Sequence, residues 1–216
     1  MKIKKGKHYH LIYALVAVLL VTASCNNSDA IKPPFRIKSI NYNQLPANTE
    51  DGHYNAVIEI PAGTNKKIEY NKESKKFEID QRDGKDRIIN FLPYPGNYGY
   101  VPGTLMDKER GGDGDAVDIL VLAESLPTGT VISVKPIASL LLFDEGEADT
   151  KLIAIPIDTS LQTMRIQGFE HFMIDYDAAK HLIETWFMNY DGLGTNEFRG
   201  WKNEEYAEKE IEKWLK

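Results

Sequence analysis

The sequence predicts a mainly β fold, in which a small β-barrel carries α-helices packed on its outside. Two observations support this prediction. Short runs rich in β-branched and aromatic residues, interrupted by turn-forming residues, fill positions 56–157, and segments with helical periodicity appear only after position 177. Short strands followed by helices are typical of a small barrel with its helices on the outside.

The strands are expected at short β-rich runs bounded by turn residues. In order they are residues 56–60, 67–70, 76–80, 117–122, 130–143 and 151–157. The run 130–143 is long enough to bend around a barrel. The segment 90–103 is rich in Pro, Gly and Tyr, and we expect it to form an ordered loop.

Two helices are expected at the carboxyl end of the chain. Residues 177–190 place Leu182, Ile183, Trp186 and Phe187 along one stripe, which predicts an amphipathic helix. Residues 203–215 are charged and rich in helix-forming side chains.

The first 24 residues have the pattern of an export signal. Four lysines form a basic head, an apolar run spans Leu11–Val21, and small residues precede Cys25, the only cysteine in the chain. Such a segment is a secretory signal and is too short to span a membrane. The cysteine after small residues resembles a bacterial lipoprotein processing site, although Thr22 stands where leucine is usual; the alternative is an ordinary signal peptide with a stray cysteine. We expect an exported protein of the bacterial cell envelope, attached to the membrane only by a lipid on Cys25, with its domain in the periplasm or at the surface.

The rest of the chain is expected to form a tether and one domain. Residues 25–50 are polar and contain prolines, which predicts a tether, and residues 51–216 suit a single domain. Without residues 1–24 the chain has 22 basic and 32 acidic side chains, a formal balance of −10. This balance argues against non-specific nucleic-acid binding. It suits carboxylates gathered for metal ions, although a solvated acidic surface is the commoner cause.

The most informative motif is the glycine-rich acidic run that precedes the strand at 117–122. Asp113, Asp115 and Asp118 fall within six positions, and Gly112 and Gly114 let the backbone bend beside them. Carboxylates this close repel one another, so they stay ionised together when cations lie among them. A solvated acidic turn is the structural alternative, and an EF-hand-like calcium loop fits poorly because the third acid is displaced.

Two further segments carry candidate ligands. Residues 144–151 form a second acidic cluster that ends in Lys151; it suits a hairpin tip, or a site in which Lys151 faces a bound anion. Residues 93–100 contain three tyrosines, whose hydroxyls either pack or donate to phosphate oxygens.

Taken together, these segments resemble the family I soluble inorganic pyrophosphatases. The run Asp113-Gly114-Asp115-Ala116-Val117-Asp118 is similar to the family signature, with Ala116 where proline or glutamate is usual. The resemblance extends from about residue 57 to residue 190 and implies an OB-like five-stranded barrel with flanking helices. It also implies Mg²⁺-dependent hydrolysis of inorganic pyrophosphate to two phosphates by metal-activated water, with several Mg²⁺ ions per site, Mn²⁺ as a substitute, and a homo-oligomeric assembly.

The resemblance implies a role for each of twelve residues. Asp115 resembles the general base. The implied metal ligands are Glu59, Asp113, Asp118, Asp144 and Asp149. The implied substrate-binding residues are Lys67, Glu69, Arg87, Tyr98, Lys151 and Tyr190. The structural alternative for these positions is an exposed charge or a packed tyrosine.

The sequence also departs from the family pattern. Asp191 follows Tyr190 where a lysine is usual, so a cation from the loop at 192–200, Arg199 or Lys202, is expected to replace it. Arg82 is a weaker alternative to Arg87, and an insertion at 106–112 is expected to lengthen a surface loop. The alternative functions are a catalytically weakened metal- or phosphate-binding surface lipoprotein, and a hydrolase of another small phosphoanhydride.

Overall fold

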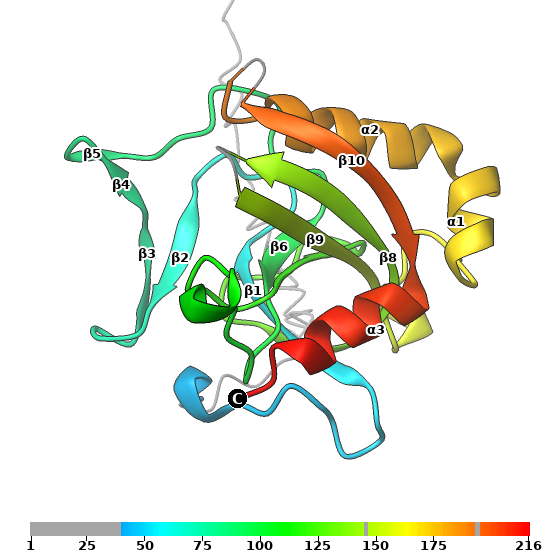
Figure 1. The fold of residues 1–216 in the computed structure, drawn as a ribbon, viewed down its shortest axis with the longest axis horizontal. Helices are drawn as coiled ribbons and strands as arrows, with labels where there is room; N and C mark the ends of the chain where they lie inside the picture. Colours follow the sequence, from blue (N-terminus) through cyan, green and yellow to red (C-terminus); the bar gives the residue numbers. More distant parts are fainter. Residues whose placement is uncertain (1–39, 145–146, 193–194) are drawn as a thin grey trace, which may run out of the picture. The chain divides into compact units, whose positions relative to one another are not determined.

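The computed structural model describes residues 40–144, 147–192 and 195–216, so the expected export signal and Cys25 lie outside the described residues. Figure 1 shows the arrangement of the helices and strands. The strands are β1 (Tyr54–Ile60), β2 (Ile68–Asn71), β3 (Lys76–Ile79), β4 (Gln81–Arg82), β5 (Lys85–Asp86), β6 (Asn97–Tyr100), β7 (Asp118–Val121), β8 (Val131–Asp144), β9 (Glu147–Pro156) and β10 (Asn196–Asn203). The α-helices are α1 (Phe169–Asp175), α2 (Asp177–Asn189) and α3 (Glu204–Lys213), and the 3-10 turns are η1 (Tyr42–Gln44), η2 (Lys108–Arg110) and η3 (Thr159–Leu161).

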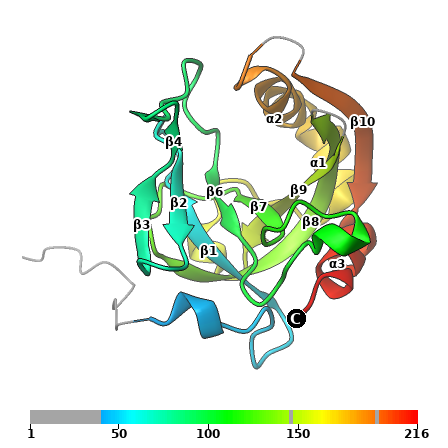
Figure 2. The same cartoon turned by 60° about the vertical axis from the view of Figure 1, so that its left-hand side comes forward.

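Five of the strands form a closed ring. β1 pairs with β6, β6 with β7, and β8 with β9, all antiparallel, whereas β7 and β9 are parallel. The first part of β8 pairs with β1, from Tyr54–Val134 to Val57–Val131, and this pairing closes the ring. Figure 2 shows this ring with the helices outside it. The prediction of a mainly β fold with a five-stranded barrel and flanking helices is confirmed.

One edge of the long strand β8 pairs with two strands in succession, β1 and then β10, while the other edge pairs with β9. Its register against β9 shifts between Pro136 and Ala138, and proline has no N–H to give to a ladder. Before the shift β8 completes the ring; after it, β8 pairs with β10 from Ala138 to Asp144. The β8–β9 hairpin therefore extends past the ring and carries Asp144 and Asp149 to its end.

Five helices and strands differ from the expectation, and one of them is β6, which lies inside the segment predicted as a loop. Gly99 explains the difference, because a Cβ at this position would lie 1.9 Å from the carbonyl oxygen of Val57 in β1. The glycine that suggested a loop is what lets two strands approach each other. The other unpredicted elements are the two-residue strands β4 and β5, the exposed strand β10 and the short helix α1.

The helices cover the apolar outside of the barrel. In α2, Ile183, Trp186 and Phe187 are buried as expected, but Leu182 is 53% exposed and does not belong to the stripe. Helix α3 begins at Asn203, whose side chain accepts a hydrogen bond from the N–H of Tyr206 (3.1 Å). No helix within the described ranges is both long and apolar enough to cross a membrane.

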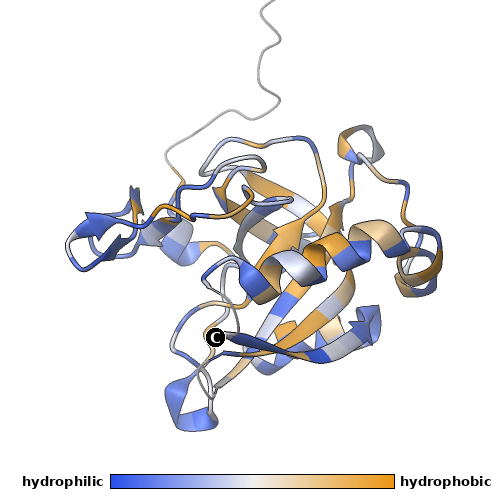
Figure 3. Ribbon diagram, turned by 90° about the horizontal axis from the view of Figure 1, so that it is seen from above, coloured by the Kyte–Doolittle hydropathy of each residue, from blue (hydrophilic) through white to orange (hydrophobic). Residues whose placement is uncertain are grey.

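A polar arm, formed by β2 to β5, extends from the barrel. β2 pairs with β3, and β4 pairs with β5 across a two-residue turn of Asp83 and Gly84, both with positive φ. Paired positive φ angles are typical of the tight hairpin turn that Asp-Gly favours. Figure 3 shows apolar residues concentrated on the central strands, whereas the arm is largely hydrophilic.

Two segments without a strand also pack on the domain. Within the stretch assigned to the tether, the hydroxyl of Tyr42 donates to the carbonyl oxygen of Gly129 (2.8 Å), and the Tyr42 ring packs on Phe77. The insertion at 106–112 contains η2, and Arg110 donates to the carbonyl oxygen of Lys213 (2.9 Å) while its guanidinium lies over Trp214. The insertion is therefore fastened to the end of α3.

Candidate active site

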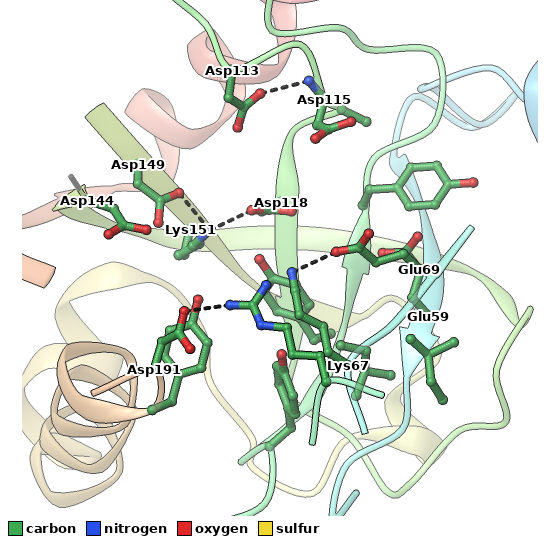
Figure 4. A pocket seen from close by; sticks show the side chains of 18 of the residues that line it. Glu59, Lys67, Glu69, Asp113, Asp115, Asp118, Asp144, Asp149, Lys151 and Asp191 are labelled. Atoms are coloured by element: carbon green, nitrogen blue, oxygen red, sulfur yellow. Dashed lines mark hydrogen bonds and ion pairs between the residues drawn. The ribbon is translucent and has the colours of Figure 1, made fainter. Parts of the chain in front are cut away.

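A cavity of about 910 Å³ lies between the arm, the end of α2 and one side of the ring. All twelve residues singled out from the sequence line it, and Figure 4 labels ten of the charged lining residues. Within the described residues, its charged lining consists of Glu59, Glu69, Asp113, Asp115, Asp118, Asp144, Asp149 and Asp191 together with Lys67, Lys72, Arg82, Arg87 and Lys151. Eight carboxylates face five cationic side chains, so the cavity has an excess of negative charge.

The acidic run forms a tight loop at one side of the cavity. The Asp113 carboxylate accepts a hydrogen bond from the N–H of Asp115 (2.8 Å), and the N–H of Gly114 donates to the carbonyl oxygen of Met106 (2.7 Å). Gly114 has a φ of 93°, a conformation that favours glycine. Burial, together with the nearby charges of Asp118 and Asp115, raises the pKa of Asp113 above its ordinary value. The Asp115 side chain, by contrast, is 79% exposed to the cavity and lies 3.6 Å from the Lys72 ammonium.

A buried lysine lies between two of the aspartates. The parallel pairing of Ile119 with Leu152 places Asp118 beside Lys151, and Asp149 lies two residues before Lys151 on the same face of β9. The Lys151 ammonium is 2.6 Å from both carboxylates. Burial lowers the pKa of Lys151, but the charges of Asp118 and Asp149 outweigh this effect, so the pKa stays well above its ordinary value and Lys151 remains charged.

Glu59 reaches the cavity from β1. One of its carboxylate oxygens accepts a hydrogen bond from the N–H of Tyr70 (2.7 Å), which fixes the side chain against the arm. Burial raises the pKa of Glu59 to about 8, and the charges of Asp118 and Glu69 add to the effect. Glu69 lies on β2, and the ammonium of Lys67, the residue before this strand, lies 2.7 Å from its carboxylate.

Tyrosines form the apolar wall of the cavity. Tyr190 stacks on Trp186 with ring centroids 4.7 Å apart, and Tyr94 packs against both Trp186 and Tyr98. Burial raises the pKa of Tyr98 and that of Tyr190, so both hydroxyls keep their protons at neutral pH and serve as hydrogen-bond donors. Tyr94 also lines the cavity but was not singled out from the sequence, although it stands in the same motif as Tyr98.

The cation expected to reach the cavity from the 192–200 loop does not line it. Neither Arg199 nor Lys202 lines the cavity; Arg199 instead forms an ion pair with Glu197 (2.9 Å) outside it. Two arginines of the arm approach Asp191 in their place: Arg82, at 3.0 and 2.8 Å, and Arg87, at 2.6 Å. The arginine that the sequence ranked second therefore lines the cavity together with the one ranked first.

The carboxylates match divalent metal ions in chemical type. No three His, Cys, Asp or Glu side chains in the described part of the chain converge as a ready-made metal cluster. However, the cavity holds more carboxylates than cations, and burial raises the pKa of Asp113, Asp149 and Glu59, so added cations would favour their ionised forms. Carboxylate oxygens are the ligands that Mg²⁺ prefers.

The family assignment follows from comparison with known proteins. The family model described as inorganic pyrophosphatase matches residues 56–216, the part of the chain that contains the ring, the arm and the cavity. The chain belongs to the inorganic pyrophosphatase family.

Two relatives support the assignment. The inorganic pyrophosphatase of Neisseria meningitidis serogroup B is 32% identical over 188 residues, which cover 81% of this chain and 97% of that protein. That of Helicobacter pylori strain J99 is 33% identical over 185 residues, which cover 82% of this chain and 98% of that protein.

Solved structures of inorganic pyrophosphatases have the same fold. The enzyme from Neisseria gonorrhoeae matches with a TM-score of 0.65 and 30% identity, over 81% of this chain and 96% of the other. The enzyme from Thermus thermophilus matches with a TM-score of 0.68 and 27% identity, over 80% and 95% of the two chains. The barrel described above thus has the fold of solved inorganic pyrophosphatases.

Proposed function

We propose that this protein hydrolyses inorganic pyrophosphate to two phosphates with the help of Mg²⁺ ions, for which Mn²⁺ can substitute. The observation that carries the proposal is the cavity itself, in a chain of the inorganic pyrophosphatase family: eight carboxylates and five cationic side chains surround one space. Pyrophosphate is a compact anion, and so many carboxylates would repel it. Binding therefore needs additional cations among the carboxylates.

The metal ligands in this proposal come from both sides of the cavity. Asp113, Asp118 and Asp149 are the proposed ligands of the tight sites, and Asp144 and Glu59 those of the ion that accompanies substrate. When bound, the ions lower the pKa of the attacking water and neutralise phosphoryl charge. Asp118 and Asp149 already share the Lys151 ammonium, which limits their mutual repulsion before any ion binds.

Asp115 is the proposed general base. Its backbone is held by the Asp113 side chain and by the hydrogen bond from the N–H of Met106 to its carbonyl oxygen (2.6 Å), whereas its carboxylate is largely exposed to the cavity. A group fixed at the backbone and accessible at the carboxylate can accept a proton from the attacking water. No covalent intermediate is needed.

The proposed phosphoryl-binding groups line the same cavity. Lys67, Arg87 and Lys151 supply positive charge, and the protonated hydroxyls of Tyr98 and Tyr190 supply hydrogen-bond donors. Glu69 orients Lys67 through their ion pair. Charge that develops on the leaving phosphate is stabilised by these cations, the electrostatic effect that usually dominates such reactions.

The proposed reaction is tested by phosphate release from pyrophosphate by the purified protein, with Mg²⁺ and with chelator. Rapid release that chelator abolishes is the expected result. Tripolyphosphate and nucleotides, assayed in parallel, should turn over much more slowly if pyrophosphate is the substrate. A folded protein that releases no phosphate with Mg²⁺ or Mn²⁺ would instead favour a metal- or phosphate-binding protein.

The proposal extends to location. The basic head, the apolar run Leu11–Val21 and Cys25 support an exported lipoprotein whose domain lies in the periplasm or at the cell surface. Replacing Cys25 by alanine should move the protein from the membrane fraction to the soluble fraction. Membrane retention of this variant would contradict the lipid anchor.

A homo-oligomer is the proposed assembly. Leu92 (62% exposed) and Leu182 (53% exposed) border an apolar groove of about 330 Å³ beside α2, and apolar surface of this kind is usually covered by a partner. Sedimentation analysis of the purified protein should give a mass that is a multiple of the chain mass. A monomer at micromolar concentration would contradict this assembly.

A further inference from the structure

Asp191 joins two parts of the cavity that are far apart in the sequence. It follows Tyr190 at the end of α2 and accepts hydrogen bonds from two arginines of the arm. Both terminal nitrogens of Arg82 contact it, one on each carboxylate oxygen, at 3.0 and 2.8 Å. Arg87 contacts the second oxygen at 2.6 Å and also pairs with Asp80 at 3.3 Å.

The position of Arg82 depends on the hairpin that carries it. Arg82 pairs with Lys85 across the Asp83-Gly84 turn, so the hairpin has only two residues in each strand. The Arg82 side chain is 55% exposed, and a long exposed side chain on a short hairpin would sample many orientations. The two parallel hydrogen bonds to Asp191 select one orientation, because a planar guanidinium fits a carboxylate as a fork.

The orientation that Asp191 selects places Arg82 at the substrate cavity. Arg82, Arg87 and Asp191 all line it, so the bridge is not a contact on the outer surface. Within the described residues, the bridge uses two of the five N–H donors of Arg82, which leaves donors for a bound anion. The charges of Arg82 and Arg87 balance those of Asp191 and Asp80, so this corner adds no net negative charge to the acidic cavity.

The neighbouring groups agree with a phosphoryl-binding corner. Tyr190, the residue before Asp191, is a proposed phosphoryl ligand, and Arg87 is another. Arg87 is mostly buried, and its Nε has no hydrogen-bond partner within the described residues. A buried N–H donor without a partner is costly, and an anion in the cavity would offer it one.

We propose that Arg82 binds a phosphoryl group of pyrophosphate and that Asp191 is the positioning residue that aims its guanidinium into the cavity. The proposal rests on the proposed function and extends it to residues that the family resemblance does not assign. The family resemblance implies a lysine directly after Tyr190, and Arg82 of the arm would supply the positive charge in its place. Asp191 then takes no part in binding by itself; it acts through Arg82, because Arg87 keeps a second carboxylate partner in Asp80.

The test compares the kinetics of Arg82→Ala and Asp191→Asn with those of the parent protein at saturating Mg²⁺. Arg82→Ala should raise KM for pyrophosphate by about tenfold or more, the effect of losing a charge-assisted hydrogen bond. Asp191→Asn should raise KM less, and the double variant should behave like Arg82→Ala alone, because Asp191 acts through Arg82. Arg199→Ala is the matched control: it removes an arginine and an ion pair outside the cavity and should leave KM unchanged.

Rescue separates binding from a structural role. In the Arg82→Ala background, Asp191→Lys should restore KM to near the parent value, because it returns a positive charge to the same corner. If Arg82→Ala lowers the melting temperature but leaves KM within twofold of the parent value, the Arg82–Asp191 ion pair only stabilises the position of the arm, and the proposal is wrong. The same conclusion follows if the double variant shows fully additive effects on KM.

A binding measurement keeps this proposal distinct from the proposed function. If the parent protein hydrolyses no pyrophosphate, the proposed function fails, and calorimetric binding of inorganic phosphate with Mg²⁺ still tests Arg82. Arg82→Ala should weaken phosphate binding about tenfold, and Arg199→Ala should not. Equal phosphate affinity in the parent and in Arg82→Ala would overturn the role of Arg82.

Discussion

Replacing Lys151 by methionine should destabilise the metal-free protein far more than the protein with Mg²⁺. Lys151 is only 6% exposed, and its ammonium lies 2.6 Å from both Asp118 and Asp149. Methionine fills a similar volume but leaves two carboxylates facing each other without a cation. Removing one partner of a buried ion pair costs about 3–5 kcal/mol. For a domain of this size each kcal/mol corresponds to about 2–4 °C, so the melting temperature in chelator should fall by roughly 6–20 °C.

The assay is thermal unfolding followed by circular dichroism, in chelator and in saturating Mg²⁺. Mg²⁺ binds the folded state and supplies the missing positive charge. The difference in melting temperature between Lys151→Met and the unsubstituted protein should therefore shrink markedly when Mg²⁺ is added. Lowering the pH should also shrink it, because the protonation of Asp149 relieves the repulsion. Lys135→Met is the matched control, since Lys135 lies on β8 and does not line the cavity. If Lys151→Met lowers the melting temperature equally in chelator and in Mg²⁺, the view that lysine and metal compensate the same carboxylates is refuted.

Three further substitutions test the base, a buried acid and the barrel. Asp115→Asn should lower turnover by at least about 10²-fold and should change the free energy of unfolding by no more than about 0.5 kcal/mol. Glu109→Gln, outside the cavity, is the control. Near-normal phosphate release by Asp115→Asn would remove Asp115 from the mechanism. Burial raises the pKa of Glu59 to about 8 in the folded protein, whereas the ordinary pKa of a glutamate is 4.5. Between these values the folded protein keeps a proton that the unfolded chain has released. The free energy of unfolding in chelator should therefore fall as the pH rises from about 5 to 8. Urea unfolding of Glu59→Gln should show a flatter pH dependence, and an unchanged slope would contradict the assignment. Gly99→Ala should cost about 3 kcal/mol or more in urea unfolding, because its Cβ would overlap the carbonyl oxygen of Val57; a loss below about 1 kcal/mol would contradict the close approach of β1 and β6.

The parts of the fold with strong local patterns were predictable from the sequence. The strands that became β1, β7, β8 and β9 are apolar and β-branched, and the stripe of Ile183, Trp186 and Phe187 indicated α2 correctly. Strand β6 was missed because its sequence, Asn97-Tyr98-Gly99-Tyr100, has loop composition, and only the packing against Val57 explains the glycine. Strand β10 is mostly exposed and charged, so pairing with β8, and not composition, determines it.

Likewise, part of the candidate site could be predicted from local sequence patterns and part could not. The acidic run was recognisable because Asp113, Asp115 and Asp118 lie close together in the sequence and meet in space. The partnership of Arg82 with Asp191 could not be found in this way, because 109 positions separate them and neither belongs to a local motif. The absence of the usual lysine was visible in the sequence at Asp191. The sequence led us to expect a replacement cation from the adjacent loop, whereas the structure places Arg82 of the arm beside Asp191.

The pairing of β1 with β8 determines when the protein can become active as it folds. This pairing joins residues 54–57 to residues 131–134, so a loop of roughly 75 residues must close before the ring exists. Contacts between such distant segments form slowly compared with hairpins and helices. Glu59 lies at the end of β1, Asp118 begins β7, and Tyr190 follows α2, so no hairpin or helix that forms early holds a complete set of site residues. We therefore expect the folding chain to form its hairpins and helices before the complete site, and we expect opening of the ring to separate the site residues.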